Sequence, residues 1–459
     1  MKTWMFALCC LVASCQVCSI GCRPPTSASS EADGESPATA TSAAAPLAEL
    51  AEDDGLRWDD QLSEWTQAAH AHESAERYSE AIAQWEQIRG ELLRGLPPDH
   101  WQVVNCDWAI RMDRRLSQLT PDEQTRFARL QELDQTALRQ ALVGAARNAL
   151  DQVREARQIA EQLFGSDSVL PVNIRFKTAR LAVQIDEWDL AAQEFQAGID
   201  TALRLWPAVH PELELAYADL AAVELERGHE ATAVEFLAKA HQTALGLYGP
   251  DHLQTARRAN DLGVALHRAG QLSAALEALA AAERARRNLQ ASPTLIAECE
   301  LNAAAVLIDL QRWDEARGKL QSICDADQRE PLAAAVITEA RSNRATLFTL
   351  EKDFAAAAAE LELILASIRE SLGDLNPRYA DFSYRLGMNL GFQGKFADAE
   401  TKLRHALSVQ TNLLGKESPS TRKSAQALAA VLERLGRSTE ATDLAVQYSV
   451  PRPAATSQN

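Results

Sequence analysis

Apolar residues recur every three or four positions through most of the chain. Around residue 228, Leu220 and Val223 precede a polar segment, and Ala233, Leu237 and Ala240 follow it. An α-helix turns every 3.6 residues, so this spacing places the apolar side chains on one side of a helix. The pattern therefore predicts helices rather than strands.

Short turn-like segments separate these stretches at a nearly constant interval. They begin at Glu76, Gly144, Asp186, Gly228, Gly270, Gln311, Lys352, Gly394 and Gly436. From Gly144 onward the intervals are 42, 42, 42, 41, 41, 42 and 42 residues, whereas the first interval is 68. Such a period indicates a repeat array, in which each unit buries its apolar side against its neighbours.

Three positions keep their character around all nine turns. Five residues after the turn start stand Ala81, Ala149, Ala191, Ala233, Ala275, Ala316, Ala357, Ala399 and Ala441. Seven residues before it stand Ala69, Ala137, Ala179, Ala221, Gly263, Ala304, Ala345, Gly387 and Ala429. Nine residues after it stand Trp85, Val153, Phe195, Leu237, Leu279, Leu320, Leu361, Leu403 and Ala445. Small residues on both arms allow two antiparallel helices to approach closely, and we expect the larger residue to fill the groove between successive hairpins.

Proline and glycine support the same division into helices. Thr120-Pro121, Ser292-Pro293, Asn376-Pro377 and Ser418-Pro419 each place a polar residue before Pro, as at the start of a helix. Gly165, Gly249, Gly373 and Gly415 stand shortly before helix starts, where we expect the preceding helices to end.

Together these residues resemble the tetratricopeptide repeat, a helix–turn–helix unit. The shared features are the small residue before the turn, Gly-x-aromatic at the turn and Ala after it, over about residues 60–448. The segments Leu247–His252 and Leu372–Pro377 resemble the longer kinesin-light-chain-like variant. The resemblance implies an all-α fold, a right-handed superhelical solenoid of antiparallel helix pairs. HEAT or armadillo repeats, of about 40–47 residues, are the second interpretation.

The array departs from regularity at both ends. The long first interval predicts an extra helix or an irregular unit within residues 100–142, and the last unit stops near Tyr448. We therefore expect an N-terminal repeat-like unit over 57–143, the array over 144–449 and a disordered tail over 450–459.

The first residues predict export. Residues 1–21 combine a positive start at Lys2 with the apolar run Trp4–Ala13, as in a secretory signal peptide. A Cys after a small residue resembles the bacterial lipoprotein signal, which implies acylation of Cys22 or, alternatively, Cys15. Residues 22–56 are rich in Ser, Thr, Ala, Pro and Glu and predict a disordered tether. We therefore expect an exported, membrane-anchored lipoprotein that faces the periplasm or the cell exterior. The alternative is an ordinary signal peptide that is cleaved without acylation.

Charge and cysteine content narrow the partners and the chemistry. The chain has 46 Lys and Arg against 64 Asp and Glu, a net charge of −18, which argues against nucleic-acid binding. The same negative charge argues against electrostatic binding to an anionic membrane. We therefore expect the N-terminal lipid to be the sole link to the membrane. Cys299 and Cys324 stand 12 before and 13 after Gln311, at similar height in a hairpin. They could form a disulfide outside the cytoplasm, or they could be two small buried residues.

No motif indicates catalysis, a cofactor or a metal site. Gly391–Lys395 lacks the spacing and the Ser or Thr of a phosphate loop, and Ser420–Lys423 lacks the partner motifs of Ser-x-x-Lys enzymes. His70 and His72 are two residues apart, so they do not share a helix face for zinc. We expect a protein that is not an enzyme, although a catalytic protein without a recognisable motif stays possible.

The resemblance implies that the first helix of each unit lines a concave groove, which holds a segment of a partner protein. Nine residues before successive turns the chain has the polar residues Lys177, Asp219, Asp261, Asn302, Asn343 and Arg385. Nearby positions on the same helices add Arg180, Arg257, Asn260, Tyr384 and Lys423. They predict a scaffold that binds a protein or peptide partner, or simply form a solvated helix face. The alternative function is an extracytoplasmic sensory module that binds a small ligand or peptide.

Overall fold

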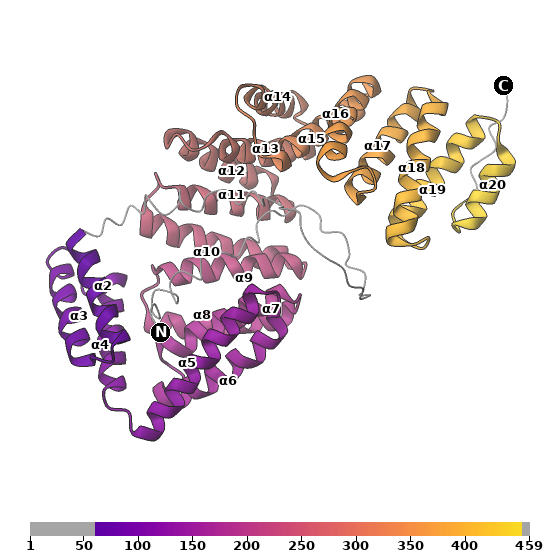
Figure 1. The fold of residues 1–459 in the computed structure, drawn as a ribbon. Coiled ribbons are helices and arrows are strands. Elements are labelled where there is room, and N and C mark those ends of the chain that lie inside the picture. Colours follow the sequence, from indigo (N-terminus) through magenta and orange to yellow (C-terminus); the bar gives the residue numbers. More distant parts are fainter. Residues whose placement is uncertain (1–59, 452–459) are drawn as a thin grey trace. The chain divides into compact units, whose positions relative to one another are not determined.

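The computed structural model describes residues 60–451, which form helices joined by short loops (Figure 1). Within that range there are 19 helices and no strand, which confirms the predicted all-α fold. The signal peptide, Cys15, Cys22 and the tether lie outside the described residues. The described chain divides into two compact units between Leu289 and Gln290.

The first unit begins with three helices and continues as four hairpins. The three helices are α2 (Asp60–Ser74), α3 (Tyr78–Leu92) and α4 (Trp101–Leu116). The hairpins are α5 (Pro121–Leu142) with α6 (Ala146–Phe164), α7 (Val169–Gln184) with α8 (Trp188–Leu205), α9 (Pro211–Glu226) with α10 (Glu230–Tyr248), and α11 (Leu253–Arg268) with α12 (Leu272–Asn288).

The second unit contains four further hairpins. They are α13 (Pro293–Asp309) with α14 (Trp313–Arg329), α15 (Ala334–Leu350) with α16 (Phe354–Leu372), α17 (Pro377–Phe392) with α18 (Phe396–Leu414), and α19 (Pro419–Arg434) with α20 (Ser438–Gln447). The last helix has 10 residues and ends just before Tyr448, as the sequence predicted.

The long first interval contains one extra helix, α4. This helix packs against α3, whereas α5 forms a regular hairpin with α6 around Gly144. The boundary expected between 143 and 144 therefore falls inside a hairpin. Trp108 Nε1 donates to the Leu205 carbonyl oxygen at 3.0 Å, and His210 Nε2 bonds Asn105 Oδ1 at 3.1 Å. These bonds fasten α4 to the loop between α8 and α9.

Every predicted turn start has a positive φ angle. The five glycines among them lie between 73° and 79°. The four others also adopt this left-handed conformation: Glu76, Asp186 and Gln311 at 58° and Lys352 at 65°. Left-handed backbone normally favours glycine, because a Cβ atom is crowded there by about 1–2 kcal/mol. The packing of the two helices in each hairpin therefore keeps the turn residue in this conformation even where it is not glycine.

The small residues astride the turns are where the paired helices meet. All nine Ala residues after the turn are fully buried, and the Ala or Gly residues before it are buried as well. Near Gly263, an added Cβ atom would lie 2.6 Å from Leu279 Cγ and 3.3 Å from the Ala275 carbonyl oxygen. The two helices are thus too close for any larger side chain unless one of them moves.

The larger apolar residue differs from the expectation in one respect. Leu279 and Leu403 contact Gly263 and Gly387, the small residues of their own hairpins. Both leucines therefore pack inside their own hairpins, a contact that the sequence analysis did not predict; the filling of the groove between successive hairpins stays a prediction. The reason for the contact inside the hairpin is the helix period, since five and nine residues after the turn lie four apart and share one face.

Helix ends follow the proline and glycine signals. Gly165, Gly249, Gly373 and Gly415 all end helices, with φ between 79° and 82°. Thr120 forms a reciprocal capping box with Glu123 at the start of α5. Asn376 accepts a hydrogen bond from the Arg378 backbone nitrogen at 2.9 Å.

The close contact at Gly387 can be tested against a glycine on the same helix. In a Gly387→Ala variant the new Cβ would lie 2.7 Å from Leu403 Cγ. We expect this variant to lose about 1–3 kcal/mol of unfolding free energy through overpacking. Gly391→Ala is the control, because its Cβ would meet only Val431 Cγ2 at 3.9 Å, and the better helix propensity should add up to about 1 kcal/mol. Urea unfolding followed by circular dichroism measures both variants, and equal changes would contradict the close-contact interpretation.

Candidate functional site

The first helices of successive hairpins lie on the inner side of each unit. In the first unit α7 contacts α9, and in the second α13 contacts α15 and α17 contacts α19. Second helices of successive hairpins do not approach each other as closely within the described chain. Each stack therefore curves with its first helices inside, and we call their solvent side the inner face. The predicted groove residues all lie on these first helices.

In the first unit, several predicted groove residues neutralise charges of neighbouring hairpins. Lys177 on α7 forms an ion pair with Asp134 on α5. Arg180 Nε donates to Asp219 Oδ2 at 2.8 Å, which joins α7 to α9. Asp219 and Arg180 keep only 32% and 18% of their side-chain surface exposed. These polar residues bind successive hairpins to one another.

A buried ion pair, which the sequence analysis missed, joins the next two hairpins. Arg258 on α11 pairs with Glu214 on α9, and its Nη1 also lies 3.1 Å from Asp261 Oδ2. Burial opposes the positive charge, but Glu214 and Asp261 hold the pKa of Arg258 above its usual value. The partners of the three pairs that join hairpins stand 43, 39 and 44 residues apart, which is about one repeat. Opposite charges at that separation are the sequence signal that could have revealed them.

The second unit has a different arrangement around Arg385. Its Nη1 donates to Ser342 Oγ at 2.7 Å, and its Nη2 donates to the Ser342 carbonyl oxygen at 3.1 Å and to Thr346 Oγ1 at 2.9 Å. All three acceptors belong to α15 and are uncharged. The guanidinium also lies 5.4 Å from the ring centre of Phe382. Burial lowers the pKa of Arg385, and nearby Glu339 partly opposes that effect.

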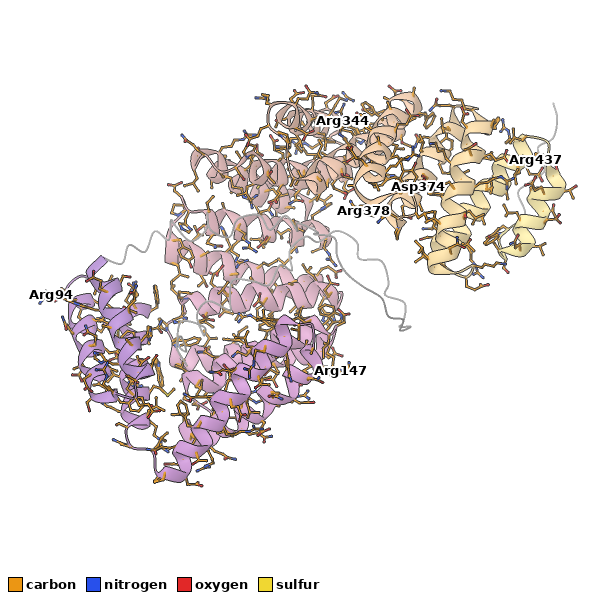
Figure 2. The ribbon with its side chains drawn as sticks, in the orientation of Figure 1. Arg94, Arg147, Arg344, Asp374, Arg378 and Arg437 are labelled. Carbon is orange, nitrogen blue, oxygen red and sulfur yellow. The ribbon has the colours of Figure 1, made fainter. Side chains whose placement is uncertain are left out.

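Two more predicted residues of the second unit keep unused hydrogen-bonding groups. Asn343 on α15 and Tyr384 on α17 are half-buried, and neither side chain hydrogen-bonds to the described part of the chain. Burial also raises the pKa of Tyr384. In the first unit Arg257, on α11, is half-buried too, and Asn302 lies on α13 in the second. Figure 2 labels Arg344 and Arg378, on α15 and α17, among the side chains around this region.

Burial raises the pKa of three carboxyl groups: Glu212 on α9, Asp381 on α17, and Asp113 in the three N-terminal helices. Asp113 on α4 is 2% exposed, and burial, reinforced by Glu73, raises its pKa to about 8. Its Oδ2 atom has no hydrogen-bond partner. Glu73 accepts a hydrogen bond from Trp85 Nε1 at 2.7 Å and lies 3.0 Å from His70 Nδ1. Asp113 is therefore a mostly protonated, buried acid at neutral pH, whose burial makes the stability of the fold depend on pH.

Within residues 60–451 the cysteines form no disulfide, and the acidic side chains form no metal-binding group. Cys299 and Cys324 are two buried thiols with no disulfide between them, so the possible bridge is not formed. Equal height in a hairpin does not make two side chains face each other, because each also follows its own helix period. Burial raises the pKa of the Cys106 thiol to about 12. Across residues 60–451, no group of three His, Cys, Asp or Glu side chains is placed to hold a metal ion. None of the described helices is long and apolar enough to cross a membrane.

Comparison with known families identifies the repeat. Residues 212–288 and 378–448 match the tetratricopeptide repeat family. These segments are tetratricopeptide repeats. They correspond to α9–α12 in the first unit and α17–α20 in the second, so both units contain them. No curated protein matches the sequence.

Several solved structures contain helical arrays similar to this chain. A tetratricopeptide repeat protein from Parabacteroides merdae has 14% identity and a TM-score of 0.47, covering 65% of this chain and 99% of that one. The quorum sensor NprR from B. thuringiensis has 13% identity and a TM-score of 0.42, covering 71% and 98%. A putative kinesin light chain from Podosopora anserina has 15% identity and a TM-score of 0.30, covering 50% and 98%. The functions in these names belong to those proteins.

The protonated state of Asp113 predicts an unusual pH dependence. A raised folded-state pKa means that the folded chain binds more protons than the unfolded chain between about pH 4 and pH 8. Stability should therefore fall as pH rises through this window, by at most about 1.4 kcal/mol per pH unit. Asp113→Asn should flatten that slope, as measured by urea unfolding at several pH values. Asp122→Asn, whose carboxylate is 85% exposed, is the control and should keep the slope; an unchanged slope in Asp113→Asn would contradict the assignment.

Proposed function

We propose that this chain is a non-catalytic scaffold that holds a segment of a partner protein against its inner face. The observation that carries the proposal is the set of half-buried polar groups on adjacent first helices. The side chains of Asn343 and Tyr384 form no hydrogen bond within the described chain. Within residues 60–451 Arg385 hydrogen-bonds only to uncharged acceptors, so no carboxylate neutralises its charge. None of these side chains has a buried atom without a hydrogen-bond partner, so water reaches their unused groups, and polar groups of a ligand can replace that water.

The two units would contribute differently to this binding. In the first unit Lys177, Arg180, Asp219 and Asp261 already have charged partners inside the chain. They would shape the inner face rather than provide its strongest contacts. In the second unit, Asn302, Asn343, Tyr384 and Arg385 are the proposed contacts with the partner; Arg257 is the corresponding candidate of the first unit, taken by itself.

We also propose that the protein is exported and tethered by an N-terminal lipid on Cys22. The support is the order of features in the sequence: a positive start, an apolar run, a Cys after Gly21, and a polar spacer up to about residue 56. The folded units would then work at a distance from the membrane, where partner proteins can reach the inner face.

The inner-face proposal is tested by crosslinking in intact cells. The photoreactive amino acid p-benzoylphenylalanine replaces Gln426, an exposed residue on the inner helix α19. In the control it replaces Asn412, an exposed residue on α18. We expect irradiation to attach one defined protein at position 426 and not at position 412, as identified by mass spectrometry. Equal products at both positions, or none at position 426, would overturn the proposal.

The lipid anchor is tested by single substitutions in the N-terminal segment. Cys22→Ala should release the protein from the membrane fraction and remove the mass added by acyl chains. Cys15→Ala should leave both unchanged. Membrane association that survives Cys22→Ala and is lost with Cys15→Ala would assign the anchor to Cys15, and its survival in both would reject acylation at these cysteines.

A further inference from the structure

The two units place a cation at the same repeat position but surround it differently. Lys177 and Arg385 both stand nine residues before a turn start, at Asp186 and Gly394. Each reaches back to the residue that stands ten before the previous turn, 43 residues earlier in the chain. For Lys177 that residue is Asp134, and for Arg385 it is Ser342. The second unit thus has a hydroxyl group where the first has a carboxylate.

Because of this difference, Arg385 forms no ion pair with a carboxylate of the described chain. Its guanidinium is half-buried, and its acceptors are two hydroxyl groups and one carbonyl oxygen. A partly desolvated cation is stabilised most by an anion that adds charge-assisted hydrogen bonds. Phe382 supports one side of the guanidinium, and Thr346, its outer acceptor, is exposed. The position is therefore accessible from the inner face.

The surroundings of Arg385 restrict what kind of anion can approach. Glu339 on α15 and Asp381 on α17 are exposed and stand 13 residues before their turns, about one helical turn from the height of Arg385. Arg385 bonds toward α15, whereas Asp381 accepts a hydrogen bond from Gln410 at 3.0 Å, and Gln410 in turn accepts one from Ser424 on α19. Along α15, α17 and α19 the charges therefore alternate: Glu339, Arg385, Asp381 and then Lys423, which is exposed. A uniformly acidic ligand would be repelled by Glu339 and Asp381.

We propose that Arg385 anchors one acidic side chain of the partner segment, and that basic residues of the same segment face Glu339 and Asp381. This assignment rests on the proposed inner-face function and specifies its ligand as a protein segment with an acidic residue between basic ones. Glu339 lies on the neighbouring helix, about 8–10 Å away, and Asp381 lies four residues along the same helix, about 6 Å away. An extended chain rises about 3.3 Å per residue, so the basic residues should stand two or three positions from the acidic one.

The test selects peptides on the purified full-length protein. A phage-displayed library of random 12-residue peptides is panned against the wild type, Ser342→Asp and Asp134→Ser. Ser342→Asp gives Arg385 an internal carboxylate, as Asp134 does for Lys177. We expect wild-type selections to enrich one Asp or Glu with Lys or Arg two or three positions away, and Ser342→Asp to lose that enrichment. Asp134→Ser is the control in the first unit and should keep it.

Calorimetric titration of the most enriched peptide completes the test. Replacing its acidic residue by Gln or Asn should weaken binding at least about tenfold for the wild type and little for Ser342→Asp. Arg385→Gln is the second variant and should bind both peptides equally weakly, with thermal unfolding recorded to verify that it folds. Peptides without an acidic residue, enrichment that persists in Ser342→Asp, or no enriched peptide would overturn the assignment. If crosslinking at position 426 still succeeds in that case, the inner-face function stands and only the acidic anchor fails.

Discussion

The close approach of two helices in each hairpin is the constraint on which the structure depends. Fully buried Ala residues after each turn face Ala or Gly residues before it, and at Gly263 and Gly387 even a methyl group would overlap a leucine. Interiors packed at this density cannot absorb an extra side chain without moving a helix. The same closeness requires a sharp reversal at the turn, which explains the left-handed backbone even at Glu76 and Gln311. Hairpins of one shape can then stack, and their first helices meet on the inner side.

Charges on that inner side determine how one hairpin recognises the next. The apolar contacts repeat from unit to unit and would accept many neighbours, whereas the pairs Lys177–Asp134, Arg180–Asp219 and Arg258–Glu214 each need one particular partner. A buried pair such as Arg258–Glu214 adds little net stability once its desolvation is counted, but removing one member is strongly destabilising. In the first unit these residues therefore contribute specificity of packing. In the second unit Arg385 meets only neutral acceptors and keeps a charge that a ligand can use.

The features predictable from the sequence are those that local geometry repeats. All nine turn starts and the buried small residues were predicted, because a turn and a helix contact are each encoded within about 20 residues. The predictions of orientation were less successful. How two helices rotate against each other determines which residues Leu279 and Leu403 contact, and whether the thiols of Cys299 and Cys324 face each other. A residue's distance from the turn does not specify that rotation. The ion pairs join residues about 40 apart in the chain, so a search for single motifs cannot reveal them. The pairing of α5 with α6 was hidden by the extra helix α4, which lengthens the first interval.

Matching of inner charges to a specific neighbour also limits how such an array can evolve. Solenoids usually grow when a whole hairpin is duplicated, because each unit touches only the units beside it. A copy of α11 and α12 inserted after the original would place its own Arg258 beside α11 instead of α9, away from Glu214, and would leave this buried cation with its own Asp261 as the acidic partner. The contact of Arg385 with Ser342 and Thr346 carries no such requirement of opposite charge. A duplicated hairpin that carries Arg385 would therefore lose no opposite charge from the preceding first helix, whereas one that carries Arg258 would lose Glu214.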